Sequence, residues 1–160
     1  MIRKVKPEDA RDIALIYNYY IEKSTITFET EPVSHEEMAG RIADISEKYP
    51  YFVYEESGKV VGYCYVSSWK KKAAYQKTVE STIYIDKDFQ GKGIGRILMN
   101  KLINELREKS FHVVIACITT PNPTSVKLHE ELGFKQVSEF REVGYKFGKW
   151  LDIGDWELIL

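Results

Sequence analysis

Cysteine and histidine are scarce in this sequence, with two cysteines and three histidines among 160 residues. Cys64 and Cys117 both stand in apolar, strand-like runs, so we expect two buried small side chains and no disulfide framework or Cys-x-x-Cys metal site. The histidines are scattered and lack the spacing of metal ligands. We therefore expect a protein without a bound metal.

Charge of one sign and long apolar runs are also missing. There are 23 basic and 24 acidic side chains, for a formal net charge of -1. This balance gives no general attraction to nucleic acid or to an anionic membrane, and no apolar run is long enough to cross a bilayer. Residues 1–6 are basic but no apolar segment follows, so no signal peptide is visible. We expect a cytoplasmic protein that binds neither nucleic acid nor a membrane.

The chain does have the size and apolar content of one domain. Its 160 residues suit a single domain over 1–160, and a hydrophobic fraction of 44% is enough to form a core. Helical spacing of apolar residues predicts a helix over 7–22. Ser34 and Glu37 form a capping box, which predicts a second helix that ends before Pro50.

Alternating and continuous apolar runs predict the strands. The expected strands are residues 2–5, 51–54, 60–67, 78–85, 112–118, 134–147 and 153–160. A third helix should follow the glycine-rich turn at 90–95, and a fourth should cover 122–132 and end at Gly133. This order predicts an α/β (α+β) domain, with a mixed, mostly antiparallel central sheet flanked by about four helices.

The most informative segment is Gln90-Gly91-Lys92-Gly93-Ile94-Gly95-Arg96, between an expected strand and an expected helix. Glycines let a backbone approach a bulky anion, and a helix start offers free N–H groups and the positive end of the helix dipole. The Walker A spacing is absent, and Arg96 stands where a dinucleotide-binding fingerprint would need its last glycine. The segment predicts another kind of phosphate cradle, although a turn that merely links strand to helix would also contain glycines.

The motif Gln-x-x-Gly-x-Gly at residues 90–95 resembles the pyrophosphate-binding motif of the GNAT acetyltransferase superfamily. Residues 122–125 (Asn-Pro-Thr-Ser) and 129–134 (His-Glu-Glu-Leu-Gly-Phe) resemble its second cofactor motif. Three more stretches are similar to the phosphinothricin acetyltransferase branch, which includes methionine sulfone and sulfoximine acetyltransferases: residues 24–32, 79–85 and 144–152. The resemblance covers nearly the whole chain and implies a GNAT-like fold and an N-acetyltransferase.

The resemblance also implies acetyl-CoA as the cofactor. The backbone N–H groups of residues 91–96 would hold its pyrophosphate, and the backbone at Ile83 and Ile85 would pair with the pantetheine arm as an added strand would. Asn122 would bond that arm or serve only as a helix N-cap, and Ser125 lies one helical turn later. The residues expected at the cofactor are Ile83, Tyr84, Ile85, Gln90, Gly91, Lys92, Gly93, Ile94, Gly95, Arg96, Asn122 and Ser125.

Acetyl transfer to an amine needs a base, because an ammonium ion is not nucleophilic. Strand alternation puts Glu80 on one face with Thr82 and Tyr84, and the resemblance makes Glu80 the expected catalytic base. Partial burial would raise the pKa of its carboxyl, although a solvated surface position would also suit a strand glutamate. No covalent enzyme intermediate is needed, so neither cysteine is expected to act as a nucleophile.

His129 is the second expected catalytic residue. It lies two helical turns after Asn122 and shares its face of the helix. Many superfamily members have tyrosine here as an acid for the leaving thiolate, whereas the phosphinothricin branch has histidine, as this chain does. His129 could donate that proton, join Glu80 in a water relay, or be a structural histidine bonded to a neighbouring carbonyl.

The small amine acceptor is expected to contact Phe28, Glu29, Thr30, Lys72 and Tyr75. Phe28 would be the apolar contact in a wall formed with the following glutamates. Lys72 belongs to a run of three lysines and stands where the branch usually has arginine. Lysine could still hold the acceptor's carboxylate, but it lacks the planar fork that binds a carboxylate through two bonds.

Two other functions stay open. The chain could acetylate another amine, such as a polyamine, an aminoglycoside or a peptide N-terminus, or it could be a non-catalytic acyl-CoA-binding sensor. The basic run Lys70–Lys72 disfavours a cationic acceptor, and the presence of both Glu80 and His129 disfavours a sensor. We also expect a homodimer, with Trp150 and Trp156 in the core or at a subunit contact.

Overall fold

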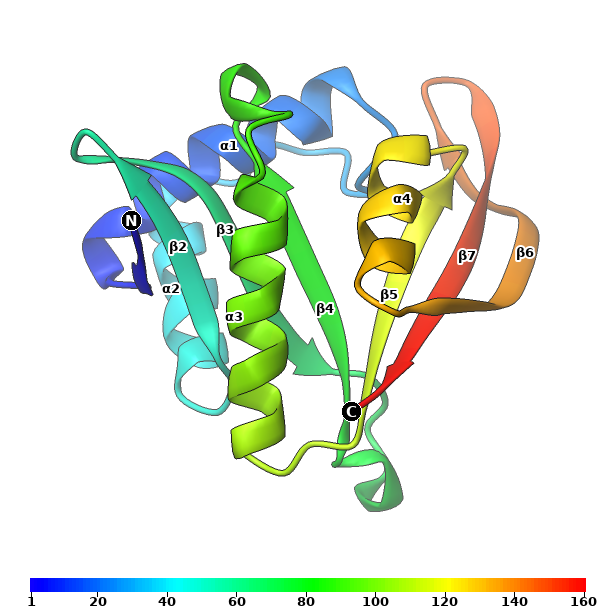
Figure 1. Cartoon of the computed structure of the whole chain (residues 1–160). Helices are drawn as coiled ribbons and strands as arrows, with labels where there is room; N and C mark the ends of the chain where they lie inside the picture. Colours follow the sequence, from blue (N-terminus) through cyan, green and yellow to red (C-terminus); the bar gives the residue numbers. More distant parts are fainter.

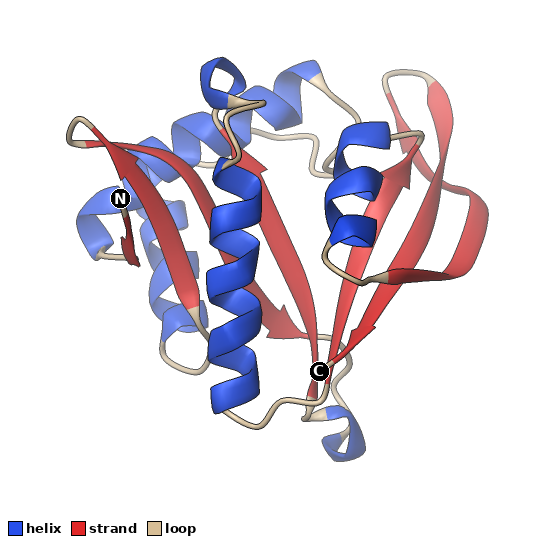
Figure 2. Ribbon diagram, viewed as in Figure 1, coloured by secondary structure: helices blue, strands red, loops and turns tan.

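A computed structural model describes residues 1–160 as one seven-stranded sheet with four α-helices around it (Figures 1 and 2). The strands lie in the order β1-β2-β3-β4-β5-β7-β6. The elements are β1 (Ile2–Lys4), α1 (Ala10–Lys23), α2 (His35–Ser46), β2 (Tyr51–Glu56), β3 (Lys59–Ser68), β4 (Thr78–Ile85), α3 (Ile94–Glu108), β5 (Val113–Thr120), α4 (Pro123–Glu131), β6 (Lys135–Lys146) and β7 (Lys149–Ile159). The predicted fold class is confirmed.

The N-terminal half contains one difference from the sequence prediction. The segment expected to be helical from residue 7 begins with a short 3-10 turn, Pro7–Asp9, and α1 starts only at Ala10. The Asp9 carboxylate explains the break, because it accepts hydrogen bonds from the Lys6 N–H at 2.7 Å and from Arg3 at 2.8 Å. The capping box before α2 is confirmed by the Glu37 N–H, which donates to the Ser34 hydroxyl at 3.1 Å.

Strands β4 and β5 form the only parallel pair in the sheet, and they separate early. Only Thr78–Glu80 of β4 are paired with β5, at Val113–Ile115, whereas β5 stays paired with β7 along its whole length. Figure 1 shows the two strands spreading apart toward their C-terminal ends. The sheet is therefore two halves that are joined at one end and open at the other.

The helices cover the two faces of the sheet unequally. Helices α3 and α4 lie on one face, with α3 over β2–β4 and α4 over β5 (Figure 1). Helices α1 and α2 lie on the opposite face, and their main contacts with the sheet are to β2–β4. Two apolar clusters result, one under α3 and one under α1 and α2. On the α1 face, the part of the sheet made by β5, β7 and β6 has no helix over it. No helix is long and apolar enough to span a membrane.

The two cysteines differ in burial, and the expectation for one of them is wrong. Cys64 is fully buried, but Cys117 is exposed. In β5 the core-forming side chains are Val114, Ala116 and Ile118, so alternation turns Cys117 toward the uncovered part of the opposite face. The apolar run predicted a strand covered on both faces. In the structure β5 has a helix over one face only, because α1 and α2 lie over β2–β4.

Candidate active site

A cavity of about 270 Å³ lies in the opening between β4 and β5. Its walls come from β4 between Glu80 and Tyr84, from β5 between Ala116 and Thr119, from Ile153 of β7, and from Asn122, Ser125 and His129 along α4. Residues 26–28, in the connection between α1 and α2, close another side. Because the strand register places side chains of both sheet faces along this opening, the cavity is reached by groups from the α4 side and from the α1 side.

The glycine-rich turn follows the far end of β4 and leads into α3. Gly91 and Gly93 have φ angles of 73° and 78°, in the left-handed region that favours glycine. No protein atom lies within 4 Å of a Cβ added at either residue, so the backbone here faces open space. The first N–H groups of a helix have no partner within it. The turn therefore presents exposed backbone donors at the positive end of α3.

The polar side chains of this turn are already engaged within the protein. Gln90 Nε2 donates to the Tyr20 hydroxyl at 2.7 Å, and that hydroxyl donates to the Ile85 carbonyl. Arg96 forms an ion pair with Glu131 of α4. The Lys92 ammonium lies 4.3 Å from the centre of the Phe89 ring. The side chains fix the turn in place, and the backbone is the part that remains free.

The backbone of Ile83 faces the opening. The Asp86 N–H donates to the Val61 carbonyl of β3 at 2.9 Å, and in an antiparallel ladder the bonding side alternates along the strand. The odd-numbered residues of β4 therefore turn their N–H and C=O groups toward β5, which has separated from β4 at Ile83 and Ile85. The Ile85 carbonyl accepts from Tyr20, which leaves both backbone groups of Ile83 and the N–H of Ile85 without a partner on β5. The Tyr84 ring packs among Tyr17, Tyr20 and Tyr63 at 5.1–5.7 Å between ring centres.

Helix α4 begins at the cavity. Asn122 is its N-cap, since the Asn122 Oδ1 accepts from the Ser125 N–H at 3.2 Å, and both residues line the cavity. Isoleucine 94 and Gly95 begin α3 on the other side of the opening, where a Cβ added at Gly95 would lie 3.3 Å from Leu128 of α4. The N-cap function expected as an alternative for Asn122 is thus present. A cofactor contact for the same residue stays a prediction.

His129 is buried, with 3% of its surface exposed. Its Nδ1 lies 2.8 Å from the Ser125 carbonyl oxygen. A carbonyl only accepts hydrogen bonds, so Nδ1 carries the proton and Nε2 keeps a free lone pair. Burial lowers the pKa of the imidazole, although the bond to Ser125 acts in the opposite direction. The ring is therefore neutral near pH 7 and has its acceptor nitrogen free.

Glu80 lines the cavity from the face opposite to α4. Partial burial raises the pKa of its carboxyl, and the nearby negative charge of Asp155 raises it further. The predicted direction of this shift is confirmed. A carboxyl with a raised pKa is a stronger base once it is ionised, which suits proton transfer.

Cys117 lines the cavity beside Glu80, and the sequence did not point to it. Although the residue is exposed to the cavity, the cavity walls partly desolvate its thiol and raise the pKa to about 12, with contributions from the carboxylates of Asp155 and Glu80. The thiol therefore stays protonated near neutral pH and is a poor nucleophile. Asp155 is the register partner of Cys117 on β7, and its Oδ2 accepts from the Ser138 hydroxyl at 2.8 Å. Alternation along β5 was the only signal that could have found this pair.

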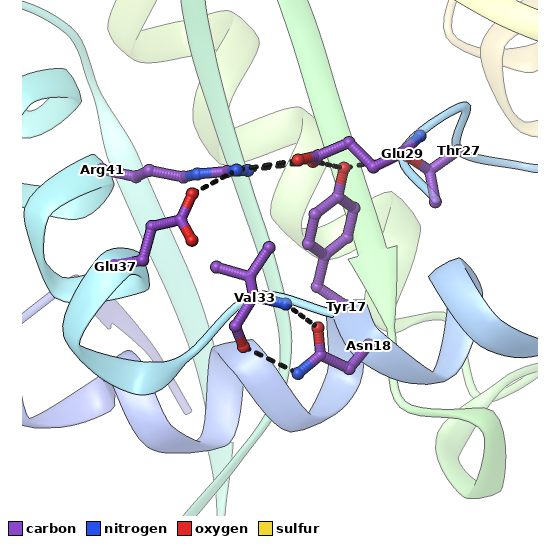
Figure 3. A network of polar contacts seen from close by, with 7 residues as sticks. All are labelled: Tyr17, Asn18, Thr27, Glu29, Val33, Glu37 and Arg41. Atoms are coloured by element: carbon purple, nitrogen blue, oxygen red, sulfur yellow. Dashed lines mark hydrogen bonds and ion pairs between the residues drawn. The ribbon is translucent and has the colours of Figure 1, made fainter. Parts of the chain in front are cut away.

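The residues predicted for the acceptor side are not all brought together. Phe28 lines the cavity, but Glu29, Thr30, Lys72 and Tyr75 do not. The Glu29 carboxylate accepts two hydrogen bonds from Arg41, at 2.7 and 2.9 Å, and one from the Tyr17 hydroxyl (Figure 3). These contacts make Glu29 part of the frame that holds its loop.

The two other predicted acceptor contacts lie on the connection between β3 and β4. Lys72 is exposed and precedes a short 3-10 turn, Ala73–Tyr75. The Tyr75 ring meets the Trp69 ring edge to face, with 5.3 Å between centres. This connection enters β4 at the end nearer Glu80, whereas the glycine-rich turn leaves β4 at the other end. The glycine-rich turn and the connection that carries Lys72 and Tyr75 therefore lie at opposite ends of β4.

Comparison with known proteins places this architecture in a family. Residues 2–153 match the acetyltransferase (GNAT) domain family. The chain belongs to the GNAT acetyltransferase family. The resemblance read from the sequence, to the superfamily and to its phosphinothricin branch, is confirmed, and so is the assignment as an acetyltransferase.

Three relatives illustrate the match. A phosphinothricin N-acetyltransferase of Streptomyces viridochromogenes is 39% identical over 157 residues, which cover 96% of this chain and 86% of the relative. An L-methionine sulfoximine/L-methionine sulfone acetyltransferase of Salmonella typhimurium is 35% identical over 156 residues, covering 95% and 90%. The crystal structure of a phosphinothricin acetyltransferase from Sinorhizobium meliloti in complex with acetyl-CoA has a TM-score of 0.96 at 35% identity, covering 100% and 88%.

Proposed function

We propose that this enzyme transfers the acetyl group of acetyl-CoA to the amino group of a small amino-acid-like acceptor. The acceptor is of the phosphinothricin, methionine sulfone or methionine sulfoximine type, as the names of its relatives suggest. The observation that carries this proposal is the cavity between β4 and β5. It combines an unpaired strand edge on one side with a carboxyl of raised pKa on the other.

The free backbone of the chain fits acetyl-CoA. The N–H groups of residues 91–96, in open space at the start of α3, would bind the pyrophosphate. The unpaired Ile83 would pair with the pantetheine arm in the manner of an added strand, and Asn122 and Ser125 line the same opening. When bound, acetyl-CoA supplies an activated thioester. A structural neighbour in complex with acetyl-CoA supports acetyl-CoA as the cofactor.

Glu80 is the proposed base. Its carboxyl would remove a proton from the acceptor's ammonium group, directly or through a water molecule, and the free amine could then attack the thioester carbonyl. As the amide bond forms, the C–S bond would break and the departing thiolate would take up the second proton that the nitrogen loses. Because burial and Asp155 raise the pKa of Glu80, the ionised carboxylate holds the accepted proton more firmly than a solvated glutamate would. Deprotonation and attack then share one cavity, which contributes through positioning.

His129 is proposed as a relay partner of Glu80. Its free Nε2 is an acceptor, and its neutral ring matches a position in a chain of water molecules that carries the proton away. To donate a proton to the leaving thiolate, the ring would first have to become charged, which its burial disfavours. Of the two catalytic functions expected from the sequence, the relay agrees better with this hydrogen-bond pattern.

Phe28 is proposed as the apolar contact of the acceptor, since its ring lines the cavity. Lys72, on the connection that enters β4 near Glu80, is proposed to meet the acceptor's carboxylate. Thr30 and Tyr75 lie outside the cavity wall, so their contacts with an acceptor depend on how far it extends beyond the cavity. Glu29 is proposed to act only through the loop that it holds.

We also propose a homodimer. Several apolar side chains of the β6–β7 hairpin have 48–64% of their surface exposed, among them Phe140, Val143, Tyr145 and Trp150. A patch of this kind commonly marks a protein contact. Trp156 is buried and belongs to the core. Sedimentation equilibrium of the wild type and of Trp150→Ser tests the proposal.

We further propose a cytoplasmic location, because both cysteines are free, which suits a reducing compartment.

One observation favours another amine as the acceptor. Asp155 places a second carboxylate close enough to Glu80 to raise its pKa, and paired carboxylates attract cationic amines. A thiol-release assay with methionine sulfone, methionine sulfoximine, phosphinothricin, spermidine and an alanine-terminated peptide distinguishes the two. We expect turnover with the first three. Turnover with spermidine or the peptide alone would leave the family assignment intact and overturn the proposed acceptor class.

A further inference from the structure

The segment 144–152, singled out in the sequence, has no function in the mechanism above. A bulge in the β6–β7 pairing leaves residues 141–143 without register partners, and the Asp152 carboxylate accepts from the Glu142 N–H at 2.8 Å. Pairing resumes at Gly144. Bulges of this kind change the direction in which the following side chains point. After this bulge, Gly144 and Lys146 are buried, while their immediate neighbours are exposed.

Gly144 lies directly against the ring of Phe28. A Cβ added at Gly144 would lie 3.0 Å or less from three carbon atoms of that ring. Real Cβ atoms essentially never approach other atoms so closely, and the φ angle of Gly144 is not positive. The requirement at this position is therefore space. Any side chain at residue 144 would push Phe28 out of its place in the cavity wall.

Lys146 holds the residue before Phe28. Its side chain has 4% of its surface exposed, and its Nζ donates to the Thr27 carbonyl at 2.9 Å. Burial lowers the pKa of this ammonium, while the Glu29 carboxylate raises it. A buried lysine is costly to keep unless its charge is used. This one forms a charge-assisted hydrogen bond to the backbone of the loop that carries Phe28.

The other side of the same loop is held by the helices (Figure 3). Asn18 exchanges two hydrogen bonds with the Val33 backbone, at 2.8 and 2.9 Å, and the Tyr17 hydroxyl bonds Thr27 Oγ1 at 2.8 Å. Phe28 itself makes no polar contact through its side chain and has 39% of its surface exposed. The position of the Phe28 ring therefore depends on the contacts that its loop makes with Gly144 and Lys146 of the β6–β7 hairpin.

We propose that Gly144 and Lys146 are positioning residues that set the acceptor wall through Phe28 and the Thr27 carbonyl. The β6–β7 hairpin, which is distant in sequence from Glu80 and from the loop of Phe28, then controls acceptor affinity without touching the acetyl donor. The proposal rests on the proposed function only in taking residues 26–28 as the acceptor side of the cavity.

The test uses Gly144→Ala and Lys146→Met, with Lys149→Met as the matched control, because Lys149 is an exposed lysine on the same hairpin. With methionine sulfone, we expect Lys146→Met to raise the KM of the acceptor about tenfold, the scale of one lost charged hydrogen bond. Gly144→Ala should also raise it, because the added methyl group displaces the Phe28 ring. The KM of acetyl-CoA should stay unchanged. The control should match the wild type. An equal rise in both KM values would overturn the proposal.

A second measurement does not depend on activity. Hydrogen exchange at the amides of residues 26–30 should accelerate in Gly144→Ala and Lys146→Met and remain at the wild-type rate in Lys149→Met. If no acceptor is turned over but exchange accelerates, the proposed function fails and the positioning stands. Wild-type exchange in both variants would overturn the positioning.

A double variant covers the case in which Gly144→Ala folds poorly. Phe28→Ala removes the ring that the new methyl group would meet, so Gly144→Ala should cost little stability in that background. If the double variant instead loses as much stability as the two single variants together, Phe28 and Gly144 do not interact, and the proposal is overturned.

Discussion

The two walls of the cavity are built in different ways. The wall proposed for the cofactor consists of two short continuous segments, one from Ile83 through the glycine-rich turn and one at the start of α4. The wall proposed for the acceptor joins the loop of residues 26–28, Glu80, Cys117 and the hairpin at Gly144. The first is a matter of local backbone conformation, and the second exists only after the whole sheet has formed. Substitutions should therefore separate the two walls in their effects.

The largest expected effect belongs to Glu80→Gln. The amide keeps the shape of the side chain but cannot accept the ammonium proton, so turnover should fall roughly a hundredfold or more. Acetyl-CoA affinity, measured by titration calorimetry, should stay at the wild-type value because Glu80 lies on the acceptor wall. Glu139→Gln, at an exposed residue of β6, is the control. Unchanged turnover in Glu80→Gln would move the base to another group.

Gly93→Val should act on the cofactor wall alone. No protein atom stands near this Cβ position, so the expected strain comes from the φ angle of 78°, which a β-branched residue adopts at a cost of about 1–3 kcal/mol. We expect the Kd of acetyl-CoA to rise about tenfold. The acceptor KM at saturating acetyl-CoA should not change. Gly40→Ala, in α2 with open space around it, controls for losing a glycine. A changed acceptor KM would break the separation of the walls.

Lys72 tests how far the acceptor wall extends beyond the cavity. Lys72→Ala should raise the KM of methionine sulfone a few-fold, about the value of one exposed ion pair. Lys72→Arg should lower it, because a guanidinium can bind a carboxylate through two bonds. Both effects should shrink when the acceptor's carboxylate is amidated. Lys71→Ala serves as the control. Equal effects on the acid and the amide would remove Lys72 from the site.

The smallest effect concerns Asp155 and pH. Its negative charge adds to burial in raising the pKa of Glu80. Asp155→Asn removes that charge, so the pKa of Glu80 should fall and the enzyme should keep its ionised base at lower pH. The acidic limb of the kcat/KM profile should move toward lower pH, and acetyl-CoA binding should not. An acidic limb that stays in place, or moves to higher pH, would show that Glu80 does not control it.

The same contrast explains what the sequence could predict. Capping boxes, apolar periodicity and the glycine pattern are local, and they predicted the four helices, the strand order along the chain and the turn before α3. Alternation also placed Glu80, and its burial and raised pKa follow from that position. The helix start at Ala10 differed because Asp9 accepts bonds from residues before it.

Contacts between distant segments were beyond sequence reasoning. Cys117 was expected to be buried, because an apolar strand does not reveal that α1 and α2 stop short of β5. The resemblance put Glu29 at the acceptor. The sequence could not show that Tyr17 and Arg41 bind its carboxylate, because they come from two helices whose packing the pattern does not specify. The contact of Phe28 with Gly144 joins residues more than a hundred positions apart, and only the folded sheet brings them together.

The early separation of β4 and β5 has a consequence for self-association. A strand with unpaired N–H and C=O groups is a template for another chain, and proteins usually blunt such edges with charges, prolines or bulges. Here the unpaired stretch at Ile83 lies inside the sheet, with β5 beyond the opening and α3 and α4 on either side (Figure 1). A ligand can reach it through the cavity between β4 and β5, whereas a strand of another protein cannot extend the sheet there, because β5, β7 and β6 follow β4 in the sheet. The unpaired N–H and C=O groups at Ile83 are thus accessible to a ligand but are not an edge on which another chain can add a strand.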